Sequence, residues 1–306
     1  MTQPVPLIIS GAPRSGTSLL YNLFDGHSQV SWLVDEGYLF EYVYDCGAAE
    51  GDTEIMLDAV PDDIGEFVDG LRHKQVIPPL HRPYRQSVAR GSVSKQNLDI
   101  PWSEQRFRTA LSNLPEPGVA GLWRRLILAC LAGLGQDEKR YACLKSPDFA
   151  KSAVAAQRAL PDARSLVIVR NPVFAIDSLR QTRRLRGEKQ LSWPNLALII
   201  RQFQKLHDRV GTLAGDRFLW VRYESLVAEP DVVMRRIADW LDIPFEPCLT
   251  EPTMLGNWWP GLSSFAATKG IESTPARREI MTLSPREVDV IRKHLAAFND
   301  TFGYGN

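Results

Sequence analysis

The sequence predicts an α/β fold in which a central parallel sheet is flanked by helices. Two observations indicate it: short apolar, strand-like runs alternate with helical stretches, and the first strand leads through a glycine-rich turn directly into a helix. A length of 306 residues suits one large α/β domain with a sizeable core. We therefore expect a single domain over residues 1–306, with an elaborated, variable region at about 47–118, where the alternation weakens.

The first predicted unit of the sheet is a strand, a loop and a helix. The apolar run 6–10 predicts a buried strand, and 17–24 predicts a helix because its leucines recur at helical spacing. Residues 30–33 predict a short second strand. Uninterrupted apolar strands of this kind are typical of a parallel sheet that is covered on both faces.

The later part of the chain repeats the alternation and ends in a well-marked helix. The expected strands are 141–144, 165–169 and 217–221, and the expected helices are 150–160, one that opens at Asn171-Pro172, 197–213 and 231–241. For the last helix Ser284 is the predicted N-cap, Pro285 takes the first helical position and Glu287 completes a capping box.

Composition and charge exclude several classes of protein. The 36 Lys and Arg cancel the 36 Asp and Glu, which argues against broad non-specific binding to nucleic acid or anionic membranes. The longest apolar stretch, 126–134, is about half of a membrane-spanning helix, and the first residues lack the basic segment of a secretion signal. Four cysteines that lie far apart favour free thiols in a reducing compartment. These features predict a cytoplasmic protein without a membrane span.

The glycine-rich turn predicts an anion-binding loop. Gly11 and Gly16 have the spacing of phosphate-binding loops between a strand and a helix, where backbone N–H groups can surround an anion. However, Thr17 stands where a nucleoside triphosphatase has its lysine, and Arg170 stands where a magnesium-binding carboxylate would follow the strand. A kinase or ATPase is therefore disfavoured, and a plain Gly-Pro turn is the alternative without function.

Two arginines predict two separate phosphate subsites. Arg14, with the hydroxyls of Thr17 and Ser18, suits a single phosphate that carries another anionic group. Arg170 follows a strand at the carboxyl edge of the sheet, and Ser178 lies about two turns into the next helix, so the pair suits a second, isolated phosphate. A mere helix cap is the alternative at this second position.

Together these motifs resemble the sulfotransferases that use 3′-phosphoadenosine 5′-phosphosulfate (PAPS) as sulfuryl donor, in particular their bacterial and Golgi branches. The matching segments are 11–18 with its Pro-Arg-Ser-Gly-Thr core, Leu-Lys-Ser-Pro at 144–147, Arg-Asn-Pro through Asp-Ser at 170–178, and Arg-Tyr-Glu-Ser-Leu at 222–226. The resemblance covers almost the whole chain except about 47–118. It implies the P-loop-like sulfotransferase fold, PAPS as donor and the desulfated nucleotide PAP as product. No metal is expected, because the chain has neither the loop lysine nor the carboxylate that would organise magnesium.

The resemblance also implies a role for each matching residue. The residues implied to bind the 5′-phosphosulfate are Arg14, Ser15, Gly16, Thr17 and Ser18. Arg170 and Ser178 would bind the 3′-phosphate, and Tyr223 would lie beside the nucleotide. Segment 262–271 is similar to the loop that closes over the 3′-phosphate, although it departs from the Arg-Lys-Gly form of the cytosolic enzymes. The contacts implied for this segment are Ser263, Ser264 and Lys269.

Sulfuryl transfer needs a base for the acceptor and a cation at the leaving-group oxygen. Glu36 lies in the segment where the resembling branches carry a catalytic glutamate, and we assign it as the base, with Asp35 as the immediate competitor. His73 and His81 of the variable region are the alternative bases. Lys145, at the end of its strand, can supply the cation.

The sequence thus predicts an enzyme that moves a sulfuryl group from PAPS to a hydroxyl or amine by in-line displacement. The acceptor stays open among small-molecule, saccharide and lipid-linked hydroxyls, because the variable region that should select it is the least patterned. The oligomeric state is equally open. The alternatives are a P-loop phosphotransferase of the kinase type and a catalytically inactive nucleotide-binding member.

Overall fold

The fold is described from a computed structural model. The described residues are 3–36, 44–45, 55–56, 85–87, 93–95, 102–112, 118–189, 191–213, 215–259, 270–271 and 279–305. Most of the predicted variable region lies outside them, so its place in a single domain stays a prediction.

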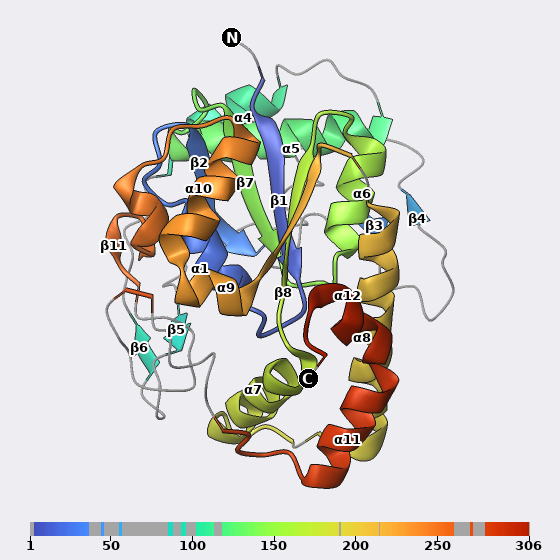
Figure 1. The fold of residues 1–306 in the computed structure, drawn as a ribbon. Coiled ribbons are helices and arrows are strands. Elements are labelled where there is room, and N and C mark those ends of the chain that lie inside the picture. Colours follow the sequence, from blue (N-terminus) through green and yellow to red (C-terminus); the bar gives the residue numbers. More distant parts are fainter. Residues whose placement is uncertain are drawn as a thin grey trace.

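A five-stranded sheet with the strand order β2-β7-β1-β8-β9 forms the centre of the molecule (Figure 1). Its strands are β1 (Val5–Gly11), β2 (Val30–Glu36), β7 (Tyr141–Ser146), β8 (Arg164–Val169) and β9 (Phe218–Arg222). Every neighbouring pair is parallel, which confirms the predicted class. Because β1 is flanked by β7 on one side and β8 on the other, the strand order reverses at β1. Ligands of open α/β sheets bind at the carboxyl ends of the strands at such a point.

Helices and short ribbons surround the sheet. The helices of the described residues are α1 (Thr17–Asn22), α4 (Glu104–Ser112), α5 (Gly118–Leu134), α6 (Lys151–Ala159), α7 (Pro172–Leu185), α8 (Trp193–Thr212), α9 (Tyr223–Ala228), α10 (Pro230–Leu241), α11 (Pro285–His294) and α12 (Ala296–Phe302). The ribbons pair β3 (Tyr44–Asp45) with β4 (Ile55–Met56), β5 (Arg85–Ser87) with β6 (Val93–Lys95), and β10 (Thr253–Met254) with β11 (Asn257–Trp258), and a 3-10 turn, η1, spans Pro247–Thr250.

Strand β8 shows why helices cover both faces of the sheet. Leu166 and Ile168 belong to one buried cluster, whereas Val167 and Val169 belong to another. Successive side chains of a strand point to opposite faces, so along β8 the two clusters lie on opposite sides of the sheet. Figure 1 shows α1, α9 and α10 on one side, with α6 and α8 on the other.

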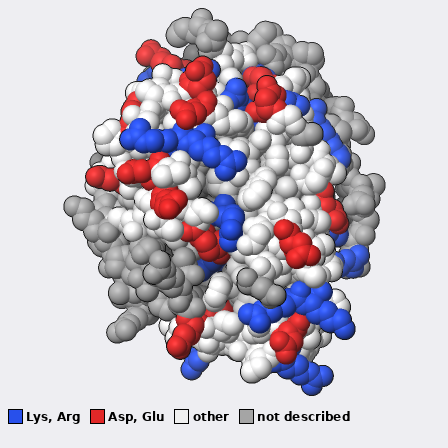
Figure 2. Space-filling view, in the orientation of Figure 1, with Lys and Arg blue, Asp and Glu red and all other residues white. Residues whose placement is uncertain are grey.

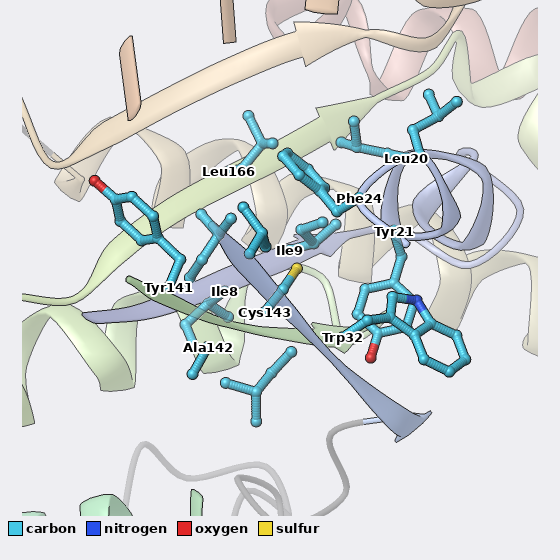
Figure 3. Packing of buried hydrophobic residues seen from close by; sticks show 14 of the residues in the cluster. Ile8, Ile9, Leu20, Tyr21, Phe24, Trp32, Tyr141, Ala142, Cys143 and Leu166 are labelled. Atoms are coloured by element: carbon cyan, nitrogen blue, oxygen red, sulfur yellow. The ribbon is translucent and has the colours of Figure 1, made fainter. Parts of the chain in front are cut away.

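Helix α1 is held firmly on its side of the sheet. Leu20 and Phe24 pack near Ile9 of β1 (Figure 3), and Tyr21 stacks on Trp32 of β2 with ring centroids 5.1 Å apart. This packing fixes the position of the loop that precedes α1.

Several predicted boundaries move in the structure. α1 ends at Asn22, two residues before the predicted end at 24, and residues 23–26 form a turn. β2 runs to Glu36 and not to 33, so Asp35 and Glu36 lie in the strand and not after it. α8 begins four residues earlier than expected, at Trp193, because Ser192 and Pro194 provide a helix start.

The predicted start of α7 at Asn171-Pro172 and the predicted capping box of α11 are confirmed. Asn171 caps α7, with Pro172 in the first turn, and Ser284 and Glu287 form a complete capping box at α11. The final helix is nevertheless interrupted, because Leu295 leaves helical geometry between α11 and α12.

Positive and negative side chains lie among one another on one face of the molecule (Figure 2). Lys and Arg side chains are interspersed with Asp and Glu on the face shown in Figure 2, in keeping with the zero net charge. No helix in the described part of the chain is both long and apolar enough to cross a membrane. Cys130, Cys143 and Cys248 are free thiols, and burial raises the pKa of Cys143.

Candidate active site

Residues 11–18, which we name the glycine-rich loop, connect β1 to α1 as the sequence predicts. Two glycines let this loop lie close to its neighbours. A Cβ atom at Gly11 would lie 2.3 Å from the carbonyl oxygen of Ile168, and one at Gly16 would lie 2.4 Å from Cδ2 of Tyr223. Gly16 also has a φ of 93°, which favours glycine. The loop is therefore seated against β8 and against Tyr223, the residue predicted to lie beside the nucleotide.

The hydroxyl of Ser15 is a buried hydrogen-bond donor in the glycine-rich loop. Its side chain is fully buried, and its Oγ has no hydrogen-bond partner, while its backbone N–H donates to the carbonyl of Ala12 at 3.1 Å. An unpaired buried hydroxyl costs about 1–3 kcal/mol. A bound anion that accepts from Ser15 would remove this cost, so the loop fits the 5′-phosphosulfate that the sequence predicts.

Lys145 reaches the other end of the loop. It is buried, and its Nζ donates to Oγ of Ser18 at 3.0 Å. The structure therefore brings together two residues that lie 127 positions apart in the sequence. An ammonium group here faces the segment predicted to hold the phosphosulfate.

Strand β2 brings Glu36 beside Lys145. Trp32 pairs with Cys143 and Glu36 pairs with Lys145, so four positions along β2 cover only two along β7. The register of the two strands therefore shifts between these pairs, and interruptions of this kind, such as β-bulges, are frequent next to active sites. The predicted base and the predicted cation thus occupy paired backbone positions on adjacent strands, although the Glu36 side chain lies outside what the structure describes.

The second predicted subsite adjoins the first. One Arg170 guanidinium nitrogen donates to the carbonyl of Arg14 at 2.8 Å, and the guanidinium lies 4.3 Å from the ring centroid of Tyr223. Nε of Arg14, in turn, lies 3.4 Å from Oγ of Ser178. The sequence assigned Arg14 to the loop subsite alone, but its side chain extends to the residue predicted for the other phosphate.

Glu224 supports this arrangement, and sequence reasoning gave it no role. Its carboxylate accepts from the backbone N–H of Asn171 at 3.0 Å and from the Tyr304 hydroxyl at 2.8 Å. Burial, together with the neighbouring Glu224, raises the pKa of Tyr304. The only signal for Glu224 was its place next to Tyr223 in the matching segment.

Helix α7 is also fastened to the chain before α11. Asp177 is fully buried and accepts from the backbone N–H of Thr282 at 2.7 Å and from its hydroxyl at 2.6 Å. Arg180 donates to both carboxylate oxygens of Glu287, at 2.7 and 3.1 Å. The hydrogen bonds from Arg180, with those from Ser284, lower the pKa of Glu287 to about 2.

Some predicted residues cannot be placed. Ser263, Ser264 and Lys269 lie outside the described residues, as do the alternative bases His73 and His81. Among the described residues, no group of three or more His, Cys, Asp and Glu side chains could hold a metal ion.

A family comparison decides the class of the protein. Residues 53–247 match the family model described as the sulfotransferase family, which is more than half of the chain. The chain belongs to the sulfotransferase family. Among curated proteins, protein-tyrosine sulfotransferase A of Caenorhabditis elegans is 24% identical over 251 residues, which cover 78% of this chain and 50% of that protein. This sulfotransferase thus spans about half the length of that curated relative.

Solved structures confirm the predicted sulfotransferase fold. The sulfotransferase domain from the curacin biosynthetic pathway is 18% identical with a TM-score of 0.56, and the match covers 97% of this chain and 99% of that one. The sulfotransferase domain of the Synechococcus PCC 7002 olefin synthase is 20% identical with a TM-score of 0.53, and the match covers 97% and 96%. At these identities the likeness shows the fold alone.

Proposed function

We propose that this sulfotransferase transfers a sulfuryl group from PAPS to a hydroxyl or amine of its acceptor. The observation that carries the proposal is the convergence of three predicted features at the carboxyl ends of β7, β1 and β8. These features are Lys145, the glycine-rich loop and Arg170. Family membership favours the reaction class.

The residues at this edge suit the two ends of the donor. The loop residues proposed to bind the 5′-phosphosulfate are Arg14, Ser15, Gly16, Thr17 and Ser18, of which Ser15 has the unpaired buried hydroxyl. Arg170 and Ser178 are proposed to bind the 3′-phosphate. Tyr223 would flank the nucleotide, since it already contacts both the loop and Arg170. In segment 262–271, the residues proposed to contact the donor are Ser263, Ser264 and Lys269.

PAPS supplies the sulfuryl group and leaves as PAP in an in-line displacement. Glu36 is proposed to take the proton from the acceptor at its carboxylate, because a positioned base is needed to make the hydroxyl or amine nucleophilic. Nζ of Lys145 is proposed to stabilise negative charge on the bridging oxygen of the leaving nucleotide. The register of β2 and β7 supports this assignment by pairing the two residues.

The acceptor is proposed to be a hydroxyl or amine outside the nucleic acids. The predicted acceptor classes are small-molecule, saccharide and lipid-linked hydroxyls. The name of the C. elegans relative adds a protein tyrosine, which is the acceptor class named for that protein. An acceptor panel should therefore include a tyrosyl peptide. A cytoplasmic location stays a prediction.

The proposed function is tested by nucleotide preference and by transfer. Adenosine 3′,5′-bisphosphate (PAP) is expected to raise the melting temperature, whereas ATP with magnesium is not, and labelled sulfate should pass from PAPS to a member of the panel in the presence of EDTA. The reverse preference, or activity that EDTA abolishes and magnesium restores, would favour a phosphotransferase. Stabilisation by PAP without transfer to any acceptor would favour an inactive member.

The assignment of the base predicts a specific loss of rate. Glu36→Gln should lower kcat by about 10²- to 10⁴-fold and leave the affinity for PAP nearly unchanged, because only the proton acceptor is removed. Lys145→Ala should also lower kcat, and Asp35→Asn is the matched control with a mild effect. Near-normal kcat in Glu36→Gln, with loss of activity in His73 or His81 variants, would move the base to the variable region.

A further inference from the structure

The turn between β7 and α6 has a strained backbone. Phe149 and Ala150 have φ values of 58° and 65°, two consecutive left-handed residues that are not glycine. Arg14 in the glycine-rich loop has a φ of 67°. These are three of the five non-glycine residues with positive φ in the described chain. Such strain persists only where the surroundings hold it, and it gathers at functional sites.

A buried carboxylate holds this turn. Asp148 is only 6% exposed, and its two oxygens accept from the Ser10 hydroxyl at 2.7 Å, from the Ser152 backbone N–H at 2.8 Å and from the Ser152 hydroxyl. The Ser10 hydroxyl in turn accepts from the backbone N–H of Ala150 at 3.1 Å. Asp148 therefore ties the turn to the last residues of β1 and to the first turn of α6.

The turn then contacts the start of the glycine-rich loop. The backbone N–H of Phe149 donates to the carbonyl of Gly11 at 3.0 Å. On the other side, the Phe149 ring packs edge to face on Phe203 of α8 at 5.6 Å, and Arg209 donates to the Phe149 carbonyl at 3.1 Å. The first residue of the loop is thereby fixed to a turn that is itself anchored on α8.

We infer that Asp148 is a positioning residue for the 5′-phosphosulfate, an inference that rests on the proposed function. Its carboxylate keeps the strained turn in place, and the turn keeps Gly11 and the loop after it at a fixed position. Asp148 and Ser10 hold the start of the glycine-rich loop, which is proposed to bind the 5′-phosphosulfate. The residues proposed to bind the 3′-phosphate, Arg170 and Ser178, follow β8 instead. Loss of Asp148 should therefore weaken binding of the 5′ group and spare binding of the 3′-phosphate.

Asp148→Asn and three nucleotides test this inference by calorimetric titration. PAP and adenosine 5′-monophosphate should each bind about tenfold more weakly than to the wild type, which corresponds to about 1.4 kcal/mol. Adenosine 3′-monophosphate, which lacks the 5′ group, should keep its wild-type dissociation constant. A merely structural role would not separate the nucleotides in this way.

Asp25→Asn is the matched control. Asp25 is 5% exposed and accepts from the Thr253 hydroxyl at 2.7 Å and from the Gly256 backbone N–H at 2.8 Å, beyond the other end of α1. This substitution should lower the melting temperature and leave all three dissociation constants unchanged. Ser10→Ala is the second variant, because it removes the link to Ala150 with a smaller change and should weaken the same two nucleotides.

The results of these titrations distinguish the positioning role of Asp148 from the proposed function. If Asp148→Asn and Ser10→Ala weaken the binding of all three nucleotides equally, the positioning role is overturned while the proposed function stands. The same holds if neither variant weakens the binding of any nucleotide. A wild-type protein that binds none of the three would overturn the proposed function and the inference with it. Failure of both variants to fold, with Asp25→Asn folded, would make the role of Asp148 purely structural.

Discussion

Two strand-to-helix junctions of the same sheet place an arginine near its carboxyl edge, but they begin their helices differently. At the β1–α1 junction the N-cap is Gly16, and no side chain caps the helix. At the β8–α7 junction the Asn171 side chain accepts from the backbone N–H of Val173, and Pro172 removes a further donor. The β1–α1 junction therefore depends on the conformation of its backbone, whereas the β8–α7 junction depends on a side-chain cap.

The difference teaches how each junction can bind an anion. The β1–α1 junction has a backbone that only glycine fits and a buried Ser15 hydroxyl without a partner, so its polar groups are open to a ligand. The β8–α7 junction satisfies its first helical donors internally, so an anion there must be bound by side chains such as Arg170 and Ser178. Substitutions should therefore damage the two junctions in different ways.

The largest effect is expected at Gly16. Gly16→Ala would place a Cβ atom 2.4 Å from the Tyr223 ring at a φ of 93°. Overpacking costs about 1–3 kcal/mol, and the left-handed backbone adds about 1–2 kcal/mol. We expect the affinity for PAP to fall by about 100-fold or more, measured by calorimetric titration.

Gly26→Ala is the control for backbone strain alone. Gly26 has a φ of 82°, and a Cβ atom there would meet nothing within 4 Å. It should lower stability but leave PAP affinity unchanged. Equal effects of the two substitutions on affinity would show that contact with Tyr223 is unimportant.

A smaller effect is expected at Arg170. Arg170→Ala should weaken PAP by about 1.5–3 kcal/mol, because a charge-assisted hydrogen bond is lost, and should change adenosine 5′-monophosphate little. Arg14→Ala should weaken both nucleotides, since Arg14 lies in the loop and also contacts Ser178. Equal weakening of both nucleotides by Arg170→Ala would contradict separate phosphate subsites.

The cap of α7 should matter for stability and not for the loop. Asn171→Ala should lower the free energy of unfolding by about 1 kcal/mol, as should the control Ser284→Ala at α11. Urea denaturation measures both. If Asn171→Ala also weakened adenosine 5′-monophosphate, the two junctions would not be independent.

The last prediction is a pH dependence of stability where α7 contacts α11. Hydrogen bonds from Arg180 are the main cause that lowers the pKa of Glu287 from 4.5 to about 2 in the folded protein. Because the folded pKa is below the unfolded one, this stabilisation is complete above the unfolded pKa and is lost as the pH falls through the folded value. Urea denaturation between these pH values should show a smaller decline in Glu287→Gln than in the wild type. Identical pH profiles would exclude the contribution.

Local sequence patterns predicted most of the fold. Strand β8 and helix α7 follow from an apolar run and an Asn-Pro start, and the capping box of α11 is visible in Ser284 and Glu287. These features depend on neighbours within a few residues. The sequence predicted that the sheet is parallel, but it did not predict the order of its strands.

The rest of the site depends on contacts between distant segments. The register shift that pairs Glu36 with Lys145 involves two strands far apart in the sequence, and the strand predicted at 30–33 ended three residues too early. The contact between Arg14 and Ser178 joins residues 164 positions apart. The roles of Asp148 and Glu224 were missed because burial and partners cannot be read from a single acidic residue in a sequence.

The central position of β1 also determines when the site can form during synthesis. Val5 pairs with Tyr141, so β1 must wait for a partner that follows it by 136 residues (141 − 5). At about 5–20 residues per second, the ribosome needs about 7–27 seconds to add that length. During this interval both edges of an apolar strand lack their final neighbours. Chaperone protection of the nascent chain is therefore expected to matter most before β7 emerges.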